Sequence, residues 1–165
     1  MTRVDFNNKK VDFFSISSFV KKNNFIYSYS EKNTGLCTGC NNVAKKSSYN
    51  YLLYSHDDMY FCPNWDKILL EEVKLIEHNK FYLSSIMING DPKLKGHLNF
   101  GAGDTVYNFD ESKLLKNFDK LKHADFQGST WAPHLIHKDI WNRVGGFSEE
   151  FSPGLGSDPD LNMKL

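Results

Sequence analysis

Apolar positions recur along the chain with two different spacings, and the alternation of the two predicts helices separated by strands. Apolar or small residues recur every three or four positions, as on one face of an α-helix, in three segments: residues 36–47, 65–76 and 110–121. A fourth helix is expected over residues 138–144, because Gly145 and Gly146 can end it in a left-handed cap. A last helix is expected to begin near Asp158.

Short apolar runs lie between these helices and predict strands over residues 25–30, 51–54 and 81–88. The run over residues 51–54 is uninterrupted, as in a strand buried on both faces of a parallel sheet. Residues 89–107 are rich in glycine and polar side chains and are expected to form a loop. Strands that alternate with helices favour an α/β domain with a mainly parallel sheet, in which ligands gather at the carboxyl ends of the strands.

Composition narrows the choice of partners. The chain has 165 residues, with 20 basic and 20 acidic side chains, so its formal net charge is zero. A zero balance removes the strongest argument for nucleic acid or an anionic membrane surface as the partner. No apolar run approaches the roughly 18–20 residues that cross a bilayer, and no transmembrane segment is expected. The length fits one globular domain over residues 1–165, which we expect to be truncated at both ends.

Three cysteines, Cys37, Cys40 and Cys62, are an odd and sparse set. Such a set argues against a disulfide scaffold and suits a reducing compartment. Cys37 and Cys40 have the spacing of a Cys-x-x-Cys pair, but no second pair has the spacing of a zinc site. We therefore expect the two thiols to be packing groups on one helix face.

Two acidic clusters carry the candidate chemistry. His56, Asp57 and Asp58 directly follow the buried strand, where a divalent cation held by a carboxylate and by phosphate oxygens would offset the repulsion of the two acids. The alternative is that the aspartates cap the following turn. In the second cluster, Asp158 could act as a general base, or Asp158 and Asp160 could simply cap the last helix.

Three segments, taken in their order along the chain, resemble motifs of family 2 glycosyltransferases. The segment from Tyr51 to Trp65 resembles the buried strand that carries the family's metal-binding DXD motif, followed by its P-x-W helix start. Near the end of the chain, residues 144–149 (Val-Gly-Gly-Phe-Ser-Glu) resemble the family's GGF-(D/S)-E turn, and residues 156–161 (Gly-Ser-Asp-Pro-Asp-Leu) resemble its G-E-D-x-D-L signature.

Upstream, Asn33, Gly35 and Asn41 are similar to the family's N-x-G…N stretch beside the donor nucleotide, and Val4-Asp5 is similar to the start of its V-D-x-x-S-x-D loop. The resemblance implies a GT-A fold, a Rossmann-type three-layer α/β/α domain. It also implies transfer of a sugar from a nucleoside-diphosphate donor, with inversion at the anomeric carbon.

The resemblance also assigns roles to individual residues. Asp158 is implied as the base that deprotonates the acceptor hydroxyl. Asp58, with His56 in the first DXD position, is implied as the ligand of a divalent cation, Mn²⁺ or Mg²⁺. The donor nucleotide is expected to contact Asp5, Gly35, Asn41 and Asp57, and the acceptor is expected to contact Trp131, Ser157 and Asp160.

The expected donor is a nucleotide-sugar, with a UDP-sugar favoured, and the expected acceptor is a carbohydrate or a lipid-linked carbohydrate. The resemblance implies a role in surface polysaccharide or glycolipid synthesis, at a cytoplasmic or membrane-peripheral location. Two alternatives stay open. One is a non-catalytic GT-A-like module that binds a sugar or a partner, and the other is a metal-dependent phosphohydrolase, suggested by the His56-Asp57 pair.

Overall fold

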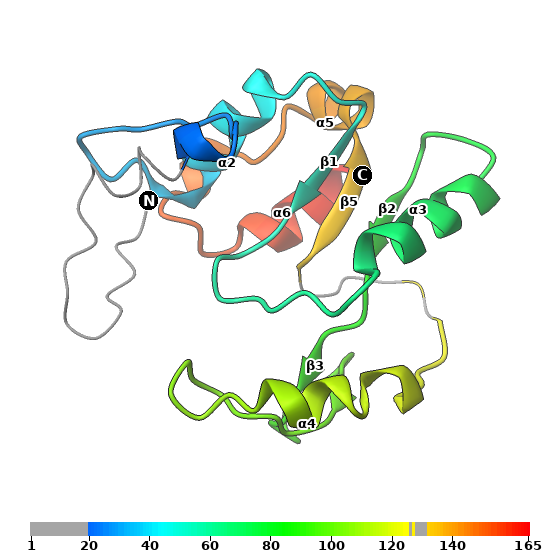
Figure 1. The fold of residues 1–165 in the computed structure, drawn as a ribbon. Coiled ribbons are helices and arrows are strands. Elements are labelled where there is room, and N and C mark those ends of the chain that lie inside the picture. The colour runs from blue at the N-terminus through cyan, green and yellow to red at the C-terminus, as the bar shows by residue number, and fades with distance from the viewer. Residues whose placement is uncertain (1–19, 126, 128–131) are drawn as a thin grey trace. The chain divides into compact units, whose positions relative to one another are not determined.

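The computed structural model describes residues 20–125, 127 and 132–165. Asp5 and Trp131 lie outside the described residues. The chain divides into two compact units (Figure 1). The first unit comprises Met1–Leu52 with Lys138–Leu165, and the second comprises Leu53–His137.

The first unit is mainly helical. Its elements are α2 (Gly35–Lys46), α5 (Lys138–Val144), the short 3₁₀ helix η2 (Glu149–Phe151) and α6 (Ser157–Lys164). The three α-helices lie in the segments that the spacing of apolar residues and the glycine pair predict, which confirms those predictions. The predicted strand over residues 25–30 is wrong. No strand is found there, and Phe25, Ile26 and Tyr29 are each more than half exposed.

The second unit contains a three-stranded sheet and a separate two-stranded one. Its elements are β1 (Tyr51–Tyr54, which spans the unit boundary), α3 (Trp65–Leu75), β2 (Tyr82–Ser84), β3 (Ile88–Asn89), β4 (Leu98–Asn99), α4 (Glu111–Leu115), η1 (Phe118–Lys120) and β5 (His134–His137). The larger sheet has the order β1-β5-β2, and β2 pairs with β5 antiparallel, with Leu83 opposite Leu135. The smaller sheet pairs β3 with β4 in parallel.

The expectation of a mainly parallel, three-layer sheet is therefore not met. The reason is visible in the burial of the strands. All four residues of the central strand β5 are buried, whereas those of β2 are only half-buried, and an antiparallel strand tolerates one partly solvated face. β1 is buried only at Tyr54, which corrects the prediction that this strand is covered on both faces.

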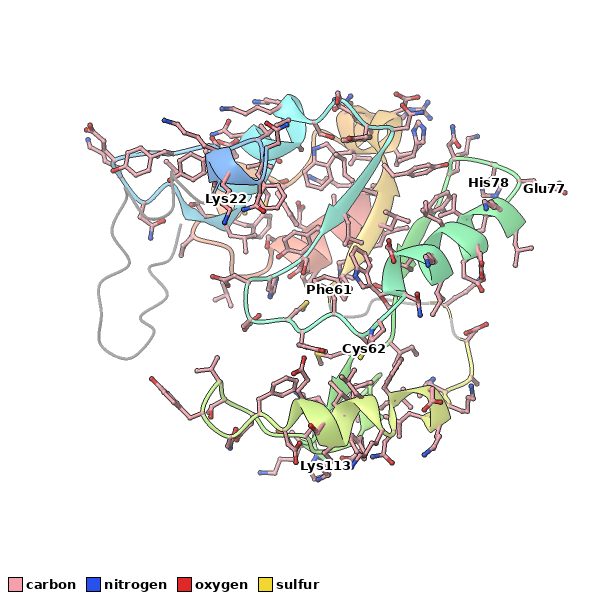
Figure 2. All side chains as sticks on the ribbon, viewed as in Figure 1. Lys22, Phe61, Cys62, Glu77, His78 and Lys113 are labelled. Carbon is pink, nitrogen blue, oxygen red and sulfur yellow. The ribbon has the colours of Figure 1, made fainter. Side chains whose placement is uncertain are left out.

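Two helix starts in the second unit differ in how they are capped. Asp110 precedes α4, and its carboxylate accepts the N–H of Lys113 at 2.8 Å, as an N-cap does. Asn64 precedes α3 with a left-handed backbone (φ 63°) and no side-chain cap bond. The loop before α3 instead packs Phe61 on Trp65, with ring centroids 4.4 Å apart; Figure 2 labels Phe61 in this loop.

The core of the first unit forms where α2, α5 and α6 meet the turn after α5. Its most deeply buried side chains are Cys37, Phe147 and Leu161. Trp141 of α5 meets Phe147 edge to face, with centroids 5.4 Å apart. The turn itself is made by Gly145 and Gly146, whose φ angles of +79° and +66° confirm the predicted left-handed cap.

The two glycines provide a matched test of this turn. A Cβ atom at Gly146 would lie 2.4 Å from Oδ1 of Asn41 and 2.9 Å from the Trp141 ring, whereas one at Gly145 would meet nothing within 4 Å. We expect Gly145→Ala to lower the free energy of unfolding by about 1–2 kcal/mol, for the positive φ alone. Gly146→Ala should lower the free energy of unfolding by about 1–3 kcal/mol more than Gly145→Ala does, because the added Cβ atom overpacks the turn. Urea unfolding of both variants checks this, and equal losses would contradict it.

Candidate functional site

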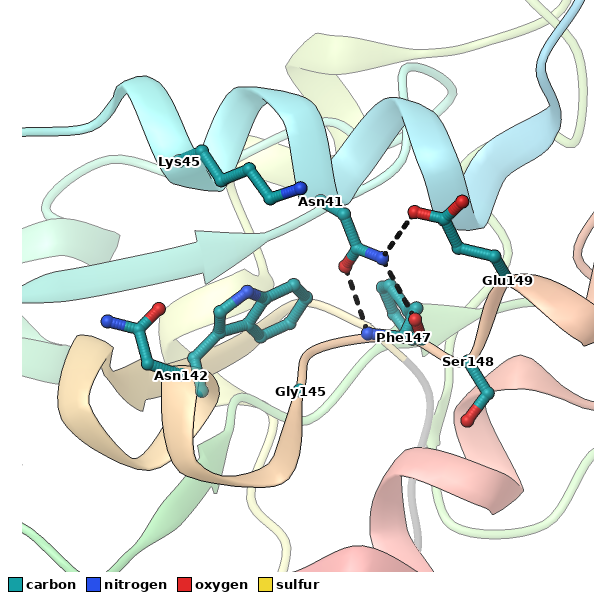
Figure 3. Close-up of a pocket in the computed structure, with 8 residues that line it drawn as sticks. Asn41, Lys45, Asn142, Gly145, Phe147, Ser148 and Glu149 are labelled. Carbon is teal, nitrogen blue, oxygen red and sulfur yellow. Dashed lines mark hydrogen bonds between the residues drawn. The ribbon is translucent and has the colours of Figure 1, made fainter.

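The turn after α5 is held to α2 by a single buried amide. Nδ2 of Asn41 donates to the carbonyl oxygen of Phe147 at 2.9 Å, and Oδ1 of Asn41 accepts the N–H of Phe147 at 3.0 Å (Figure 3). Nδ2 also donates to Oε1 of Glu149 at 3.2 Å. Asn41 therefore pairs with the backbone of Phe147 as a neighbouring strand would, and the turn cannot shift without breaking these bonds.

A pocket of about 420 Å³ lies beside this turn, entirely within the first unit. It is lined by Asn41, Lys45, Trp141, Asn142, Gly145, Phe147, Ser148 and Glu149 (Figure 3). The hydrogen bond from Asn41 is the largest influence that lowers the pKa of Glu149, and Thr38 adds to it. The pocket wall thus carries a stable carboxylate at Glu149 and a cation at Lys45.

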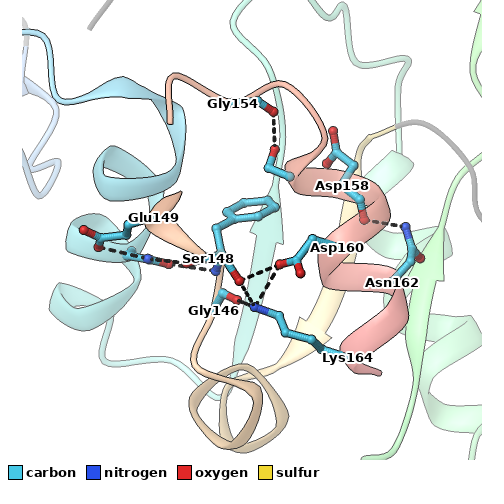
Figure 4. Close-up of polar contacts among 11 residues, drawn as sticks. Gly146, Ser148, Glu149, Gly154, Asp158, Asp160, Asn162 and Lys164 are labelled. Atoms are coloured by element: carbon cyan, nitrogen blue, oxygen red, sulfur yellow. Dashed lines mark hydrogen bonds and ion pairs between the residues drawn. The ribbon is translucent and has the colours of Figure 1, made fainter. Parts of the chain in front are cut away.

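The other side of the turn is held by α6 through Lys164. Nζ of Lys164 donates to the carbonyl oxygen of Gly146 at 2.7 Å and to Oγ of Ser148 at 2.9 Å, and it lies 3.2 Å from Oδ2 of Asp160. Oγ of Ser148 in turn donates to Oδ2 of Asp160 at 2.7 Å (Figure 4). The bond from Ser148, followed by the contacts with Lys164, lowers the pKa of Asp160.

Asp158 lies in the first turn of α6, directly after a buried residue. The hydroxyl of that residue, Ser157, donates to the carbonyl oxygen of Gly154 at 2.7 Å and lies within hydrogen-bonding reach of the Cys37 thiol. Burial is the main cause that raises the pKa of Cys40 to about 11, and the charges of Cys37 and Asp158 add to it. Both Cys37 and Cys40 are free cysteines.

Gly35 allows α2 to begin against the loop that leads into α6. Its φ is +76°, and a Cβ atom there would lie 2.3 Å from Oγ of Ser152 and 3.0 Å from the Cα atom of Pro153. The N–H of Leu36 donates to the carbonyl oxygen of Pro153 at 2.8 Å. Gly35 and Asn41 thus anchor the two segments on either side of η2.

In the second unit, β1 ends in a buried tyrosine that contacts His56. The hydroxyl of Tyr54 and Nε2 of His56 are 2.5 Å apart, and their rings meet edge to face at 5.2 Å. Asp57 and Asp58 follow on an exposed turn. The strand therefore fixes the imidazole and leaves the two carboxylates open to solvent.

A family model described as glycosyl transferase family 2 matches residues 13–141. The chain belongs to this family. Searches of curated proteins and of solved structures found no match for this chain. Membership confirms the resemblance, supports a glycosyltransferase activity at the level of the family, and implies the GT-A fold with a nucleotide-sugar donor and an acceptor. The matched residues include His56–Asp58 and end before the turn and α6.

Members of the family often use a divalent cation, and the exposed aspartates fit such an ion. Carboxylate oxygens are the ligands that Mg²⁺ and Mn²⁺ prefer, and a diphosphate supplies further oxygens. Among residues 20–125, 127 and 132–165, no three His, Cys, Asp or Glu side chains gather into a complete cation site.

The structure distributes the predicted site residues over both units of this family 2 chain. Gly35, Asn41, Ser157, Asp158 and Asp160 lie together in the first unit, and His56, Asp57 and Asp58 lie in the second. Within the described part of the chain, no helix is long and apolar enough to cross a membrane. The sequence interpretation missed Lys164, Ser148 and Tyr54. The i, i+4 spacing of Asp160 and Lys164 was the one available signal for Lys164.

His134 on β5 is a further buried group in the second unit. It is 1% exposed, its Nδ1 lies 2.5 Å from Oγ of Ser84, and the ring of Tyr82 stacks on it at 4.5 Å. Burial, aided by the charge of His56, lowers the pKa of His134 to about 4. The imidazole is therefore neutral in the folded protein at neutral pH.

This burial predicts a loss of stability in mild acid. Between pH 6.5 and about 4, the unfolded chain binds a proton at His134 that the folded chain does not, so acidification favours unfolding; above pH 6.5 the group contributes nothing. We expect the free energy of unfolding to fall between pH 7 and pH 5, and we expect up to about 2 kcal/mol of that fall to come from His134. Urea unfolding at both pH values should show that His134→Gln lacks this part of the loss. The same loss in the variant would contradict the prediction.

Proposed function

We propose that the chain transfers a sugar from a nucleoside-diphosphate donor to an acceptor hydroxyl, with inversion at the anomeric carbon. The observation that carries the proposal is the family match over residues 13–141, which supports glycosyl transfer at family level. The geometry of the first unit adds a carboxylate, Asp158, on a helix that Asp160 ties to the turn after α5.

In this proposal Asp158 is the general base. The acceptor oxygen attacks the anomeric carbon, its proton passes to the carboxylate of Asp158, and the bond from the anomeric carbon to the diphosphate oxygen breaks. The diphosphate leaves with the electron pair of that bond. A base in this role must come within about 2.6–3.2 Å of the hydroxyl, and an anchored helix keeps the carboxylate in one place.

Asp58 would hold the divalent cation, with Asp57 and His56 beside it. When bound, the ion neutralises charge that develops on the leaving diphosphate. What supports this part is the exposure of both aspartates at the end of β1, where diphosphate oxygens can complete the coordination. The contact with Tyr54 fixes the orientation of His56 next to them.

The remaining assignments complete the proposal. The nucleotide side includes Asp5, Gly35 and Asn41, and the acceptor side includes Trp131 and Ser157. We propose a UDP-sugar as donor and a carbohydrate or lipid-linked carbohydrate as acceptor, in surface polysaccharide or glycolipid synthesis. The zero net charge of the chain accords with a small-molecule donor rather than with a nucleic acid as the partner.

The donor half of the proposal predicts binding that depends on the cation. We expect Mn²⁺ to strengthen the binding of UDP, and Asp58→Ala to remove that strengthening, because the variant lacks the carboxylate that holds the ion. Calorimetry with UDP, GDP and CDP, with and without Mn²⁺, measures this. Asp66→Ala, an exposed aspartate in the first turn of α3, is the matched control and should bind as the wild type does.

If none of the three nucleotides binds while a glycan does, the chain is a binding module and the donor half of the proposal is wrong. If phosphate is released without an acceptor sugar, the phosphohydrolase interpretation gains the support instead.

The acceptor half predicts a defect confined to the chemical step. We expect Asp158→Asn to leave donor binding nearly unchanged while sugar transfer falls by about 10²–10⁴-fold, the usual contribution of a general base. Asparagine has nearly the same shape as aspartate and cannot take the proton. Assays of transfer and of UDP affinity on the same preparation separate the two effects. Transfer at the wild-type rate would remove Asp158 from this role.

A further inference from the structure

Lys164 makes a complete set of contacts. A lysine ammonium group has three N–H donors, and Lys164 has three acceptors within 3.2 Å: the carbonyl oxygen of Gly146, Oγ of Ser148 and Oδ2 of Asp160. The side chains of Lys164 and Asp160 are only 26% and 20% exposed. This partly buried, charge-assisted arrangement is stronger than an exposed surface pair.

Ser148 links the other two groups. Its hydroxyl accepts from Lys164 at 2.9 Å and donates to Oδ2 of Asp160 at 2.7 Å, so both capacities of the hydroxyl are used. The three side chains therefore form a closed set of polar contacts that links the turn after α5 to α6 (Figure 4). We refer to Ser148, Asp160 and Lys164 as the Lys164 network.

The Lys164 network holds α6 from the side that Asp158 does not face. Asp158 and Asp160 are two positions apart, which is about 200° around an α-helix, so the two carboxylates point in different directions. The charge of Asp158 instead contributes to raising the pKa of Cys37 and of Cys40. The network can thus fix the helix without occupying the carboxylate of Asp158.

We propose that Ser148, Asp160 and Lys164 are positioning residues, which tie α6 to the Gly146–Ser148 turn and so set the place of the Asp158 carboxylate. The role of Asp160 is then internal, in place of the acceptor contact that the sequence suggested. The inference rests on the proposed function of Asp158 as the base. It goes beyond that function by naming the residues that make the base effective.

A thiol-labelling experiment tests the position of α6 without any substrate. Cys37 is fully buried and lies next to Ser157, whereas Cys62 is in the second unit and serves as an internal control. The full chain is treated with N-ethylmaleimide under native conditions, and the labelled cysteines are located by mass spectrometry. We expect Lys164→Met and Asp160→Asn each to speed the labelling of Cys37 at least tenfold and to leave Cys62 unchanged.

Two further variants separate positioning from general destabilisation. Lys164→Arg keeps a cation and several donors, so it should restore most of the protection of Cys37. Lys74→Met removes an exposed lysine in the last turn of α3 and should change neither cysteine. Unchanged labelling of Cys37 in both Lys164→Met and Asp160→Asn would overturn the inference.

The catalytic arm measures the release of UDP from UDP-glucose, UDP-galactose and UDP-N-acetylglucosamine in the presence of Mn²⁺. A base displaced by about 1 Å loses on the order of 10²-fold in rate, so Lys164→Met should lower kcat by about 10- to 100-fold with the donor KM nearly unchanged. Lys164→Arg should recover most of kcat. A purely structural role would lower the melting temperature and leave kcat unaltered well below it.

Parallel measurements on Asp158→Asn keep the two proposals apart. If Asp158→Asn is inactive and Lys164→Met has the wild-type kcat, only the positioning role is wrong. If Asp158→Asn releases UDP at the wild-type rate, or if no donor is used at all, the proposed function fails and the positioning role fails with it, even where Cys37 has become reactive.

Discussion

The structure of the first unit depends on the pairing of one buried amide with one turn. A side-chain amide carries both a donor and an acceptor, so Asn41 can satisfy the N–H and the carbonyl oxygen of Phe147 at once. Both backbone groups are buried, and leaving either unpaired costs about 1–3 kcal/mol. The pairing also requires a close approach, which only glycine at position 146 permits, since a Cβ atom there would overlap Oδ1 of Asn41. The glycine at position 146 is thus explained by geometry.

The fixed position of this turn also constrains α6. Once Asn41 fixes Phe147, the neighbouring carbonyl oxygen of Gly146 and hydroxyl of Ser148 are fixed too, and Lys164 binds both. Phe147 and Leu161 are almost completely buried, so apolar packing holds the same two segments together. The helix that carries Asp158 is therefore oriented by polar bonds whose geometry is specific and by a core that resists displacement.

Local spacing predicted four of the five expected helices near their observed bounds and predicted the long-range contacts poorly. The helix expected over residues 110–121 is instead the short α4 followed by the 3₁₀ helix η1. The helices over Gly35–Lys46 and Ser157–Lys164 follow from spacing and breakers, which are properties of neighbouring residues. The central strand His134–His137 was not predicted as a strand. Two of its four buried residues are histidines, and no alternation rule places histidines in a core. The run over residues 25–30 has strand-like alternation but no strand partner among the described residues. The bond from Asn41 to Phe147 spans 106 positions, and no local pattern reports such a pair.

The two acidic clusters differ in how much the protein does to place them, and their proposed chemistry explains the difference. A cation and a diphosphate organise their own coordination shell, so Asp57 and Asp58 can stand exposed on a turn and still bind effectively. A general base has no such help, because it must meet one hydroxyl at hydrogen-bond distance in the transition state. The chain accordingly places Asp158 on a helix that Asp160 and Lys164 hold to the turn after α5.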